Sequence, residues 1–235
     1  MSSSASFSGG GRTRALTVRR VAGARGFRLV VDPRDGAVKL TLPKRAALGP
    51  ALAWAEKQRG WVEAGLAKLP VPRPIRPGGT VPYEGEPLLI DWAPALPRAP
   101  RLTDGRLELG GPEASVGARV LRWLKRRALD VLDAETRKIA AGAGVAIAAV
   151  AVGDPRTRWG SCAADDAIRY SWRLIMTPPY VRRATVAHEV AHRLHMDHSR
   201  AFHAAVRRLL GEDPAPARDW LKRNGAALHW VGREE

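Results

Sequence analysis

The chain has 235 residues, 45% of them hydrophobic, which is enough to bury one large core or two small ones. Lys and Arg number 39 against 23 Asp and Glu, so the formal net charge is +16. Such a charge predicts attraction to polyanions, so nucleic acid or a nucleotide is a candidate partner. Arg far outnumbers Lys, however, and a compositional bias of the coding sequence would give the same excess without any such partner.

The composition also excludes some classes of protein. Cys162 is the single cysteine, so an internal disulfide is excluded and a reducing compartment is expected. The first residues are rich in Ser and Gly and lack an apolar segment, which argues against a secretory signal and predicts a disordered tail over residues 1–14. The longest apolar run, Val145 to Val152, is too short to cross a bilayer. We therefore expect a cytoplasmic protein with no membrane partner; the sequence does not indicate an oligomeric state.

Residues 15–110 are predicted to form a β-rich N-terminal subdomain. Alternating apolar residues indicate strands at 16–18, 27–31 and 38–42. A helix is expected over residues 50–69, with Trp54 and Trp61 on one face and packed in the core. After a proline-rich connector, Glu84-Gly85 and Asp104-Gly105 each indicate the turn of a hairpin.

Residues 111–235 are predicted to form an α+β domain. Apolar residues at helical spacing indicate a long helix over residues 116–141, whose basic stripe is expected to face solvent or, alternatively, phosphates. The apolar run 144–152 predicts a buried strand, and residues 167–174 predict another. Helices are expected over residues 179–194, 200–210 and 215–223.

One H-E-x-x-H motif, His188-Glu189-Val190-Ala191-His192, lies in the first of these last three helices. Histidines four residues apart project from one face of a helix, so both imidazoles can hold one zinc ion. Glu189 is placed to reach a zinc-bound water as general base. The motif therefore predicts a zinc hydrolase. The alternative, a chance pattern on a solvated helix, is less favoured because the neighbouring residues are small and apolar.

A third protein ligand is needed if the metal is to keep one open position. His195 is excluded while the helix continues, because it lies about 4.5 Å further along the axis than His192. His198 follows at an expected chain reversal, just before the helix cap Ser199, and is the predicted third ligand. His203 is the second choice. The weaker alternatives are His229, Glu212, Asp213 and Asp219.

These motifs together resemble the YgjP-like family of predicted zinc metallopeptidases, which are zincins distantly similar to SprT-like peptidases. The resemblance rests on the segments 158–162 (R-W-G-S-C), 168–174, 178–181 and 188–192, and on His198-Ser199 with Phe202. It extends more weakly to the N-terminal strands and to residues 54–69.

The resemblance implies zinc ligands at His188, His192 and His198 and a catalytic glutamate at Glu189. It implies a mixed α+β zincin core in which the active-site helix lies beneath a small antiparallel sheet. Valine at 190 replaces a commoner leucine, which is a harmless apolar exchange. His203 stands where a tryptophan is usual, so it remains a candidate for the ligand set.

Three functions stay open. The first is a zinc metallopeptidase, with polypeptide as its partner; the second is a zinc-dependent nucleoside triphosphate phosphohydrolase; the third is a nucleic-acid-associated metal-binding protein. Lesser hypotheses concern single residues. Cys162 is expected to be a buried structural residue in a tight turn, with a fourth zinc ligand as the alternative. Tyr170 is considered as a hydrogen-bond donor to an oxyanion. Arg158 and Trp159 are expected to pack in the fold, with a place at the floor or rim of the site as the alternative. The edge of the strand Ile168–Leu174 is expected to pair with an extended substrate.

Overall fold

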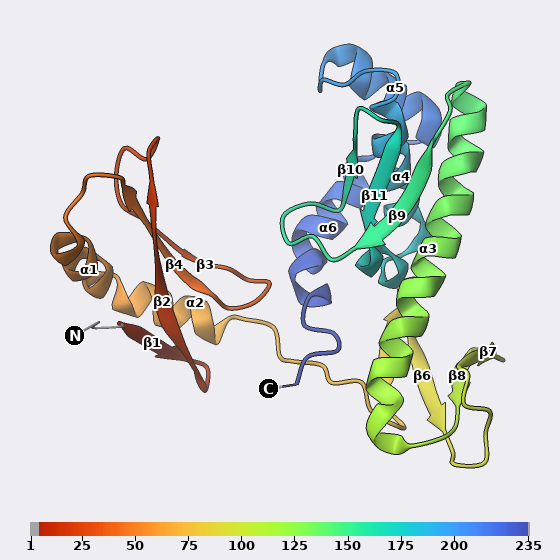
Figure 1. Ribbon diagram of the computed structural model, residues 1–235, viewed down its shortest axis with the longest axis horizontal. Coiled ribbons are helices and arrows are strands. Elements are labelled where there is room, and N and C mark those ends of the chain that lie inside the picture. Colours follow the sequence, from red (N-terminus) through yellow and green to blue (C-terminus); the bar gives the residue numbers. More distant parts are fainter. Residues whose placement is uncertain (1–4, 235) are drawn as a thin grey trace. The chain divides into compact units, whose positions relative to one another are not determined.

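The computed structural model describes residues 5–234, which form six α-helices and three small sheets (Figure 1). The α+β class expected from the sequence is therefore confirmed. The chain divides into two compact units, Met1–Val71 and Pro72–Glu235, each with its own packing. No helix in the described range is both long and apolar enough to traverse a bilayer.

The first unit is a four-stranded sheet with two helices. Its strands are β1 (Ser6–Gly9), β2 (Arg12–Val21), β3 (Arg28–Val31) and β4 (Val38–Pro43), in the order β1-β2-β4-β3. Its helices are α1 (Leu48–Lys57) and α2 (Arg59–Ala67). The three strands expected from the alternating pattern are all present.

Two expectations for this unit were wrong. A disordered tail was expected up to residue 14, but β1 pairs with β2 through a turn in which Gly10 and Gly11 have φ of 60° and 75°. Burial of Phe7 fixes this strand, and residues 1–4 of the expected tail lie outside the described residues. The single helix expected over 50–69 is broken at Gln58. Trp61, after the break, is therefore 56% exposed instead of packed in the core.

The second unit begins with both predicted hairpins. They are β5 (Thr80–Tyr83) with β6 (Glu86–Trp92), and β7 (Arg101–Thr103) with β8 (Arg106–Leu109), in the sheet order β5-β6-β8-β7. A boundary was expected after residue 110, but the division falls after Val71. The reason is that Ile90 and Leu107 are buried in one core with Val120 of the following helix, so these strands cannot belong to a separate subdomain.

A long helix and a second sheet form the centre of this unit. A short 3₁₀ turn, Glu113–Ser115, precedes α3 (Val116–Ala143), which lies beside β9 in Figure 1. The strands are β9 (Ala149–Gly153), β10 (Gly160–Cys162) and β11 (Ala167–Ser171), in the order β10-β11-β9. The sheet is mixed and not antiparallel as expected, since β11 runs parallel to β9. The buried strand expected over residues 144–152 covers only Ala149–Gly153. None of residues 144–152 is fully buried, and Ala146, Ala148 and Ala149 are exposed.

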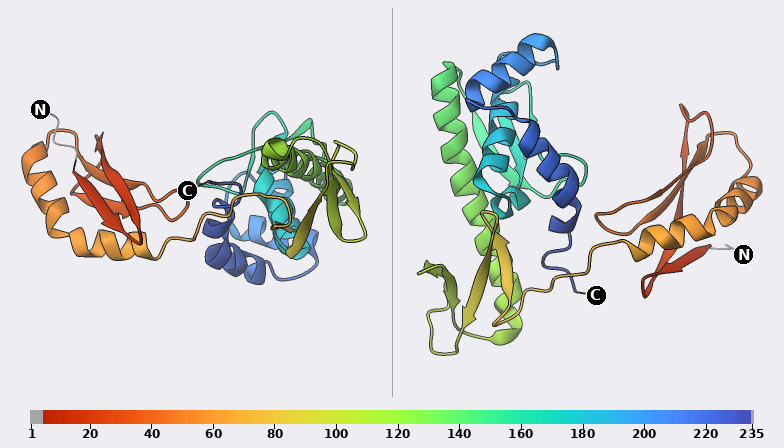
Figure 2. Two further views of the ribbon diagram at one scale, coloured as in Figure 1. Left: turned by 90° about the horizontal axis from the view of Figure 1, so that it is seen from below. Right: turned by 180° about the vertical axis from the view of Figure 1, so that it is seen from behind.

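Helices α4 (Pro179–Ala191), α5 (Arg200–Leu210) and α6 (Ala215–Leu228) complete the unit. Figure 2 shows α4 between α3 and α6, in agreement with its contacts to both. A 3₁₀ helix, Trp172–Met176, separates β11 from α4, so the strand predicted to continue to Leu174 ends at Ser171. The start of α5 follows the prediction, since the Ser199 hydroxyl accepts a hydrogen bond from the Phe202 backbone N–H.

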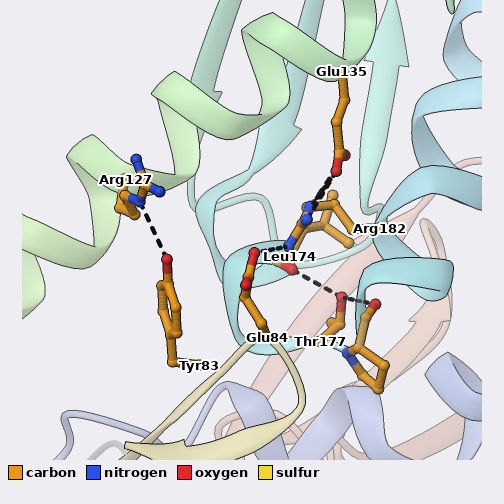
Figure 3. A network of polar contacts seen from close by, with 8 residues as sticks. Tyr83, Glu84, Arg127, Glu135, Leu174, Thr177 and Arg182 are labelled. Carbon is orange, nitrogen blue, oxygen red and sulfur yellow. Dashed lines mark hydrogen bonds and ion pairs between the residues drawn. The ribbon is translucent and has the colours of Figure 1, made fainter. Parts of the chain in front are cut away.

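The start of α4 is fixed by a buried arginine (Figure 3). The Arg182 side chain, 4% exposed, donates to both carboxylate oxygens of Glu135 on α3 at 2.8–3.1 Å. Its Nη1 also forms an ion pair with Glu84, in the turn between β5 and β6, at 3.1 Å. One guanidinium thus ties α4 to α3 and to the first hairpin. Just before α4, the Thr177 hydroxyl donates its hydrogen to the Leu174 carbonyl.

Replacing Arg182 by Ala is expected to destabilise the second unit by about 3 kcal/mol. Removing one partner of a buried ion pair costs about 3–5 kcal/mol, and the lower end applies because both carboxylates keep some solvent contact. Urea unfolding measures the change. Arg137→Ala is the matched control, since it removes an exposed ion pair with Asp133 on α3 and should cost below about 0.5 kcal/mol. Equal losses for the two variants would contradict this role for Arg182.

Candidate metal centre

The two histidines of the H-E-x-x-H motif lie at the C-terminal end of α4. His188 is in the last turn, and His192 is the C-cap residue that directly follows it. Their ring centroids are 5.0 Å apart. Phe202 of α5 is fully buried beneath them, with its ring centroid 4.9 Å from that of His188 and 4.5 Å from that of His192. Phe202 therefore forms the floor on which both imidazoles rest.

His198 completes a group of three imidazoles. The chain turns back after α4, and this turn brings Nε2 of His198 to 3.4 Å from Nε2 of His188. One ring nitrogen from each of His188, His192 and His198 lies within 4.8 Å of the others, so the three residues could hold one metal ion. His198 also rests on Phe202, at 4.8 Å between ring centroids. The structure thus brings together the three histidines that the sequence singled out.

A backbone carbonyl orients the second of these imidazoles. Nδ1 of His192 lies 3.2 Å from the carbonyl oxygen of His195. A carbonyl can only accept, so Nδ1 carries the hydrogen and the lone pair of Nε2 is left free for a metal. Burial lowers the pKa of His188 to about 4, with smaller contributions from His192 and His198. His188 is therefore neutral at pH 7, the form in which imidazole binds metals.

Glu189 lies next to His188 on α4, and its carboxylate lies against Gly160 of β10. Only 5% of its surface is exposed. Burial raises the pKa of Glu189 to about 7, while the charge of Arg158 and a hydrogen bond from the Cys162 backbone act in the opposite direction. A carboxylate of this pKa can both take up and release a proton near neutral pH.

Gly160 makes room for the Glu189 carboxylate. A Cβ atom added at Gly160 would overlap Oε1 of Glu189 and lie 2.6 Å from its Cγ. No side chain fits at this position unless Glu189 moves, so the glycine of the R-W-G-S-C segment has a steric role. The sequence alone did not reveal it, because the two residues are 29 positions apart.

Replacing Gly160 by Ala is expected to lower the turnover of the hydrolysis proposed below about 100-fold with unchanged metal content. The physical reason is that displacing a catalytic group by about 1 Å can cost about 100-fold. Gly142→Ala on α3 is the matched control, because a Cβ there meets nothing within 4 Å. Wild-type turnover in Gly160→Ala would show that the carboxylate has more freedom than this contact allows.

The other proposed site residues take different places. His203 lies outside the three-histidine group, with its ring centroid 6.4 Å from that of His198. His229 is buried beside Trp159. Among the described residues, no group of potential metal ligands includes the remaining candidates, Cys162, Glu212, Asp213 and Asp219.

Two of the lesser hypotheses were wrong. Tyr170 was considered as a donor to an oxyanion, but its side chain is fully buried and its hydroxyl is hydrogen-bonded with Thr136 of α3 at 3.0 Å. Cys162 was expected in a tight turn. It lies on β10 instead and is partly exposed. Burial of its thiol raises the Cys162 pKa, so this thiol is mostly protonated at neutral pH.

A pocket of about 280 Å³ opens beside His188 and Glu189. Its walls come from the preceding turn of α4, the start of β10, α5 and α6. The apolar lining residues are Trp159, Ala184, Val206, Pro214, Ala217 and Leu221. Arg158 and His203 also line it, together with Arg218 of α6. Arg158 and Trp159 both line this pocket, and Trp159 also packs against the hydrophobic core.

A comparison with protein-family models matches residues 25–224 to the model described as "YgjP-like, metallopeptidase domain". The chain belongs to the YgjP-like family. This confirms the resemblance drawn from the sequence motifs, and the match includes the H-E-x-x-H segment and both units. A YgjP-like metallopeptidase domain implies a metal-dependent hydrolase, which agrees with the three-histidine group. Neither the search of curated proteins nor the search of solved structures gave a match.

Proposed function

We propose that this YgjP-like protein is a zinc-dependent metallopeptidase. The observation that carries the proposal is the convergence of three imidazoles beside a buried glutamate at the wall of a pocket. Imidazole is a preferred ligand of zinc, and three protein ligands leave the fourth position for water or substrate. Two nitrogens bound at 2.0–2.1 Å to one tetrahedral ion are about 3.3–3.4 Å apart. The distance between Nε2 of His188 and Nε2 of His198, 3.4 Å, fits this geometry.

Each residue has a separate task in the proposed hydrolysis. A bound zinc ion supplies Lewis acidity, which acidifies water and polarises the scissile carbonyl. Glu189 takes a proton from the attacking water and passes it to the nitrogen of the leaving amine. The His195 carbonyl keeps the His192 ring in the orientation and tautomer that ligation needs.

The strand proposed to align the substrate changes with the structure. The edge of Ile168–Leu174 was expected to pair with an extended peptide, but β11 lies between β10 and β9, and both of its edges are occupied. Strand β10 (Gly160–Cys162) is one of the two edge strands of this sheet. It also contains Gly160, which contacts Glu189. We therefore propose β10 as the strand that binds an extended substrate by backbone hydrogen bonds.

The test is hydrolysis by the purified, zinc-loaded chain of two substrate sets, unfolded polypeptides and nucleoside triphosphates. Cleavage of polypeptide is expected, together with its loss after chelation and its return when zinc is added back. The control without enzyme activity is the Glu189→Gln variant, prepared in the same way. Hydrolysis of nucleotides without any cleavage of polypeptide would refute the peptidase proposal.

One observation favours the second candidate, a zinc-dependent nucleoside triphosphate phosphohydrolase. The guanidiniums of Arg158 and Arg218 lie at the pocket beside Glu189, and arginine binds phosphate groups as well as carboxylates. The apolar walls of the pocket could then contact a base. The substrate screen above separates the two candidates.

Nucleic-acid binding remains a prediction from net charge. Much of the basic stripe on α3 already has partners within the chain: Arg119 donates to three backbone carbonyls, and Arg127 donates to the Tyr83 hydroxyl. Arg126 and Arg137 pair with aspartates on the same helix. If nucleic acid binds through this stripe, its affinity must fall steeply with salt.

A further inference from the structure

The pocket beside Glu189 combines apolar walls with charged lining residues. Side chains from three helices, among them Ala184, Val206 and Leu221, make the walls apolar. Its volume of about 280 Å³ is just below the range of about 300–1,000 Å³ that is usual for small-molecule sites. The space therefore suits one apolar side chain better than a whole large ligand.

Two arginines bring positive charge to this pocket from different elements. Arg158 comes from the loop before β10, and Arg218 comes from the first turn of α6. Both residues are exposed, and neither side chain has a hydrogen bond or ion pair to another described residue. Both arginines line the same pocket as His188 and Glu189. Both guanidiniums are thus available to an anionic ligand.

The wall that presents Arg158 is held at both ends. The Asp154 carboxylate accepts two hydrogen bonds from the buried Arg173, at 2.8 and 2.9 Å. The Trp159 carbonyl accepts a hydrogen bond from the Ser171 backbone, and the Trp159 ring packs against α6 at Gly225, where an added Cβ would lie 2.6 Å from the ring. A loop fixed in this way can hold a guanidinium beside the pocket at low entropic cost.

We infer that this pocket binds the C-terminal residue of a polypeptide, with an apolar side chain against the walls and the free carboxylate on Arg158 and Arg218. Guanidinium groups bind carboxylates through paired N–H donors, whereas an amide or an internal peptide bond offers no such anion. The protein would then act as a carboxypeptidase. This inference rests on the proposed function and narrows its substrate class.

The reaction removes one residue at a time. Water attacks the carbonyl carbon of the last peptide bond, and its oxygen stays in the new terminal carboxylate. The C–N bond breaks, and the amine of the released amino acid receives the proton that Glu189 took up. The products are a peptide shortened by one residue and a free apolar amino acid, and no co-reactant other than water is needed.

Binding tests the recognition step apart from catalysis. Two dye-labelled peptides of one sequence ending in Leu, one with a free carboxylate and one with a terminal amide, are titrated against the full-length chain after chelator treatment. We expect about tenfold tighter binding of the free carboxylate, the effect of one hydrogen-bonded charge. Arg158→Ala and Arg218→Ala should each remove most of this preference. Arg208→Ala, an exposed arginine of α5 outside the pocket, should retain it.

Cleavage by the zinc-loaded chain tests the consequence, with products identified by mass spectrometry. We expect release of single Leu from the free-carboxylate peptide, and at least about tenfold slower cleavage of the amide. Internal cleavage of both peptides at equal rates would overturn the inference while the peptidase function stands. Equal binding of the two peptides, or an equal loss of preference in Arg208→Ala, would also overturn it. If no polypeptide of any kind is cleaved, the proposed function itself fails and this inference falls with it.

Discussion

Replacing Glu189 by Gln is expected to lower the rate of peptide hydrolysis by about 100- to 10,000-fold while the bound zinc is retained. This range is the usual contribution of a positioned general base, and the amide of Gln cannot accept the proton. Glu189 is not a member of the three-histidine group, so the ligand set is unchanged. Turnover of an unfolded polypeptide and zinc per chain are the two measurements.

A third measurement and a control variant complete this test. The unfolding temperature of Glu189→Gln should not fall, because the variant puts a neutral group of the same shape where burial disfavours a charge. Glu212→Gln, an exposed carboxylate outside the site, should leave all three quantities unchanged. Retained activity in Glu189→Gln would remove Glu189 from the mechanism even if zinc proves essential.

Replacing His198 by Ala is expected to weaken zinc binding by more than about 100-fold. Loss of groups that only orient a ligand already costs about 10- to 100-fold, and His198 is proposed as a ligand itself. His203→Ala should keep wild-type zinc content, because its ring lies 6.4 Å from that of His198 and outside the three-histidine group. Zinc per chain after dialysis, measured by elemental analysis, gives the result.

The control for this series is His188→Ala, which should lose zinc as His198→Ala does. Retention of zinc by His198→Ala together with its loss from His203→Ala would move the third ligand to α5. That outcome would keep the two histidines of the motif as ligands and change only the identity of the third ligand.

Much of the site could be predicted from local sequence, because the relevant geometry is local. Two histidines four residues apart on one helix share a face whatever the rest of the fold does. The chain reversal that places His198 near the other two histidines was also predictable, since Ser199 is a strong signal for the start of a new helix. His195 was set aside on the premise that the helix continues past it. The helix in fact ends at Ala191. His195 contributes to the site through its backbone carbonyl, a role for which a side-chain pattern gives no signal.

Errors arose where distant segments decide the outcome. The hairpins of residues 80–109 were assigned to the wrong unit, because amphipathic strands do not reveal which helix will cover them. The last helix was expected to end at residue 223, but α6 continues to Leu228, and Trp159 packs against it at Gly225. Burial of Arg182 between two carboxylates is likewise a long-range outcome, since Glu84 and Glu135 come from separate elements.

The sequence by itself therefore determined the metal-binding chemistry, the family and the α+β class, because motif spacing on one helix and local propensity are short-range properties. Only the tertiary structure decided the place of Gly160 against Glu189, the floor that Phe202 provides and the pocket between α4, α5 and α6. These features depend on packing between segments far apart in the chain. The arginines beside that pocket, Arg158 and Arg218, stand out from the many others of this basic chain only through their positions in the fold.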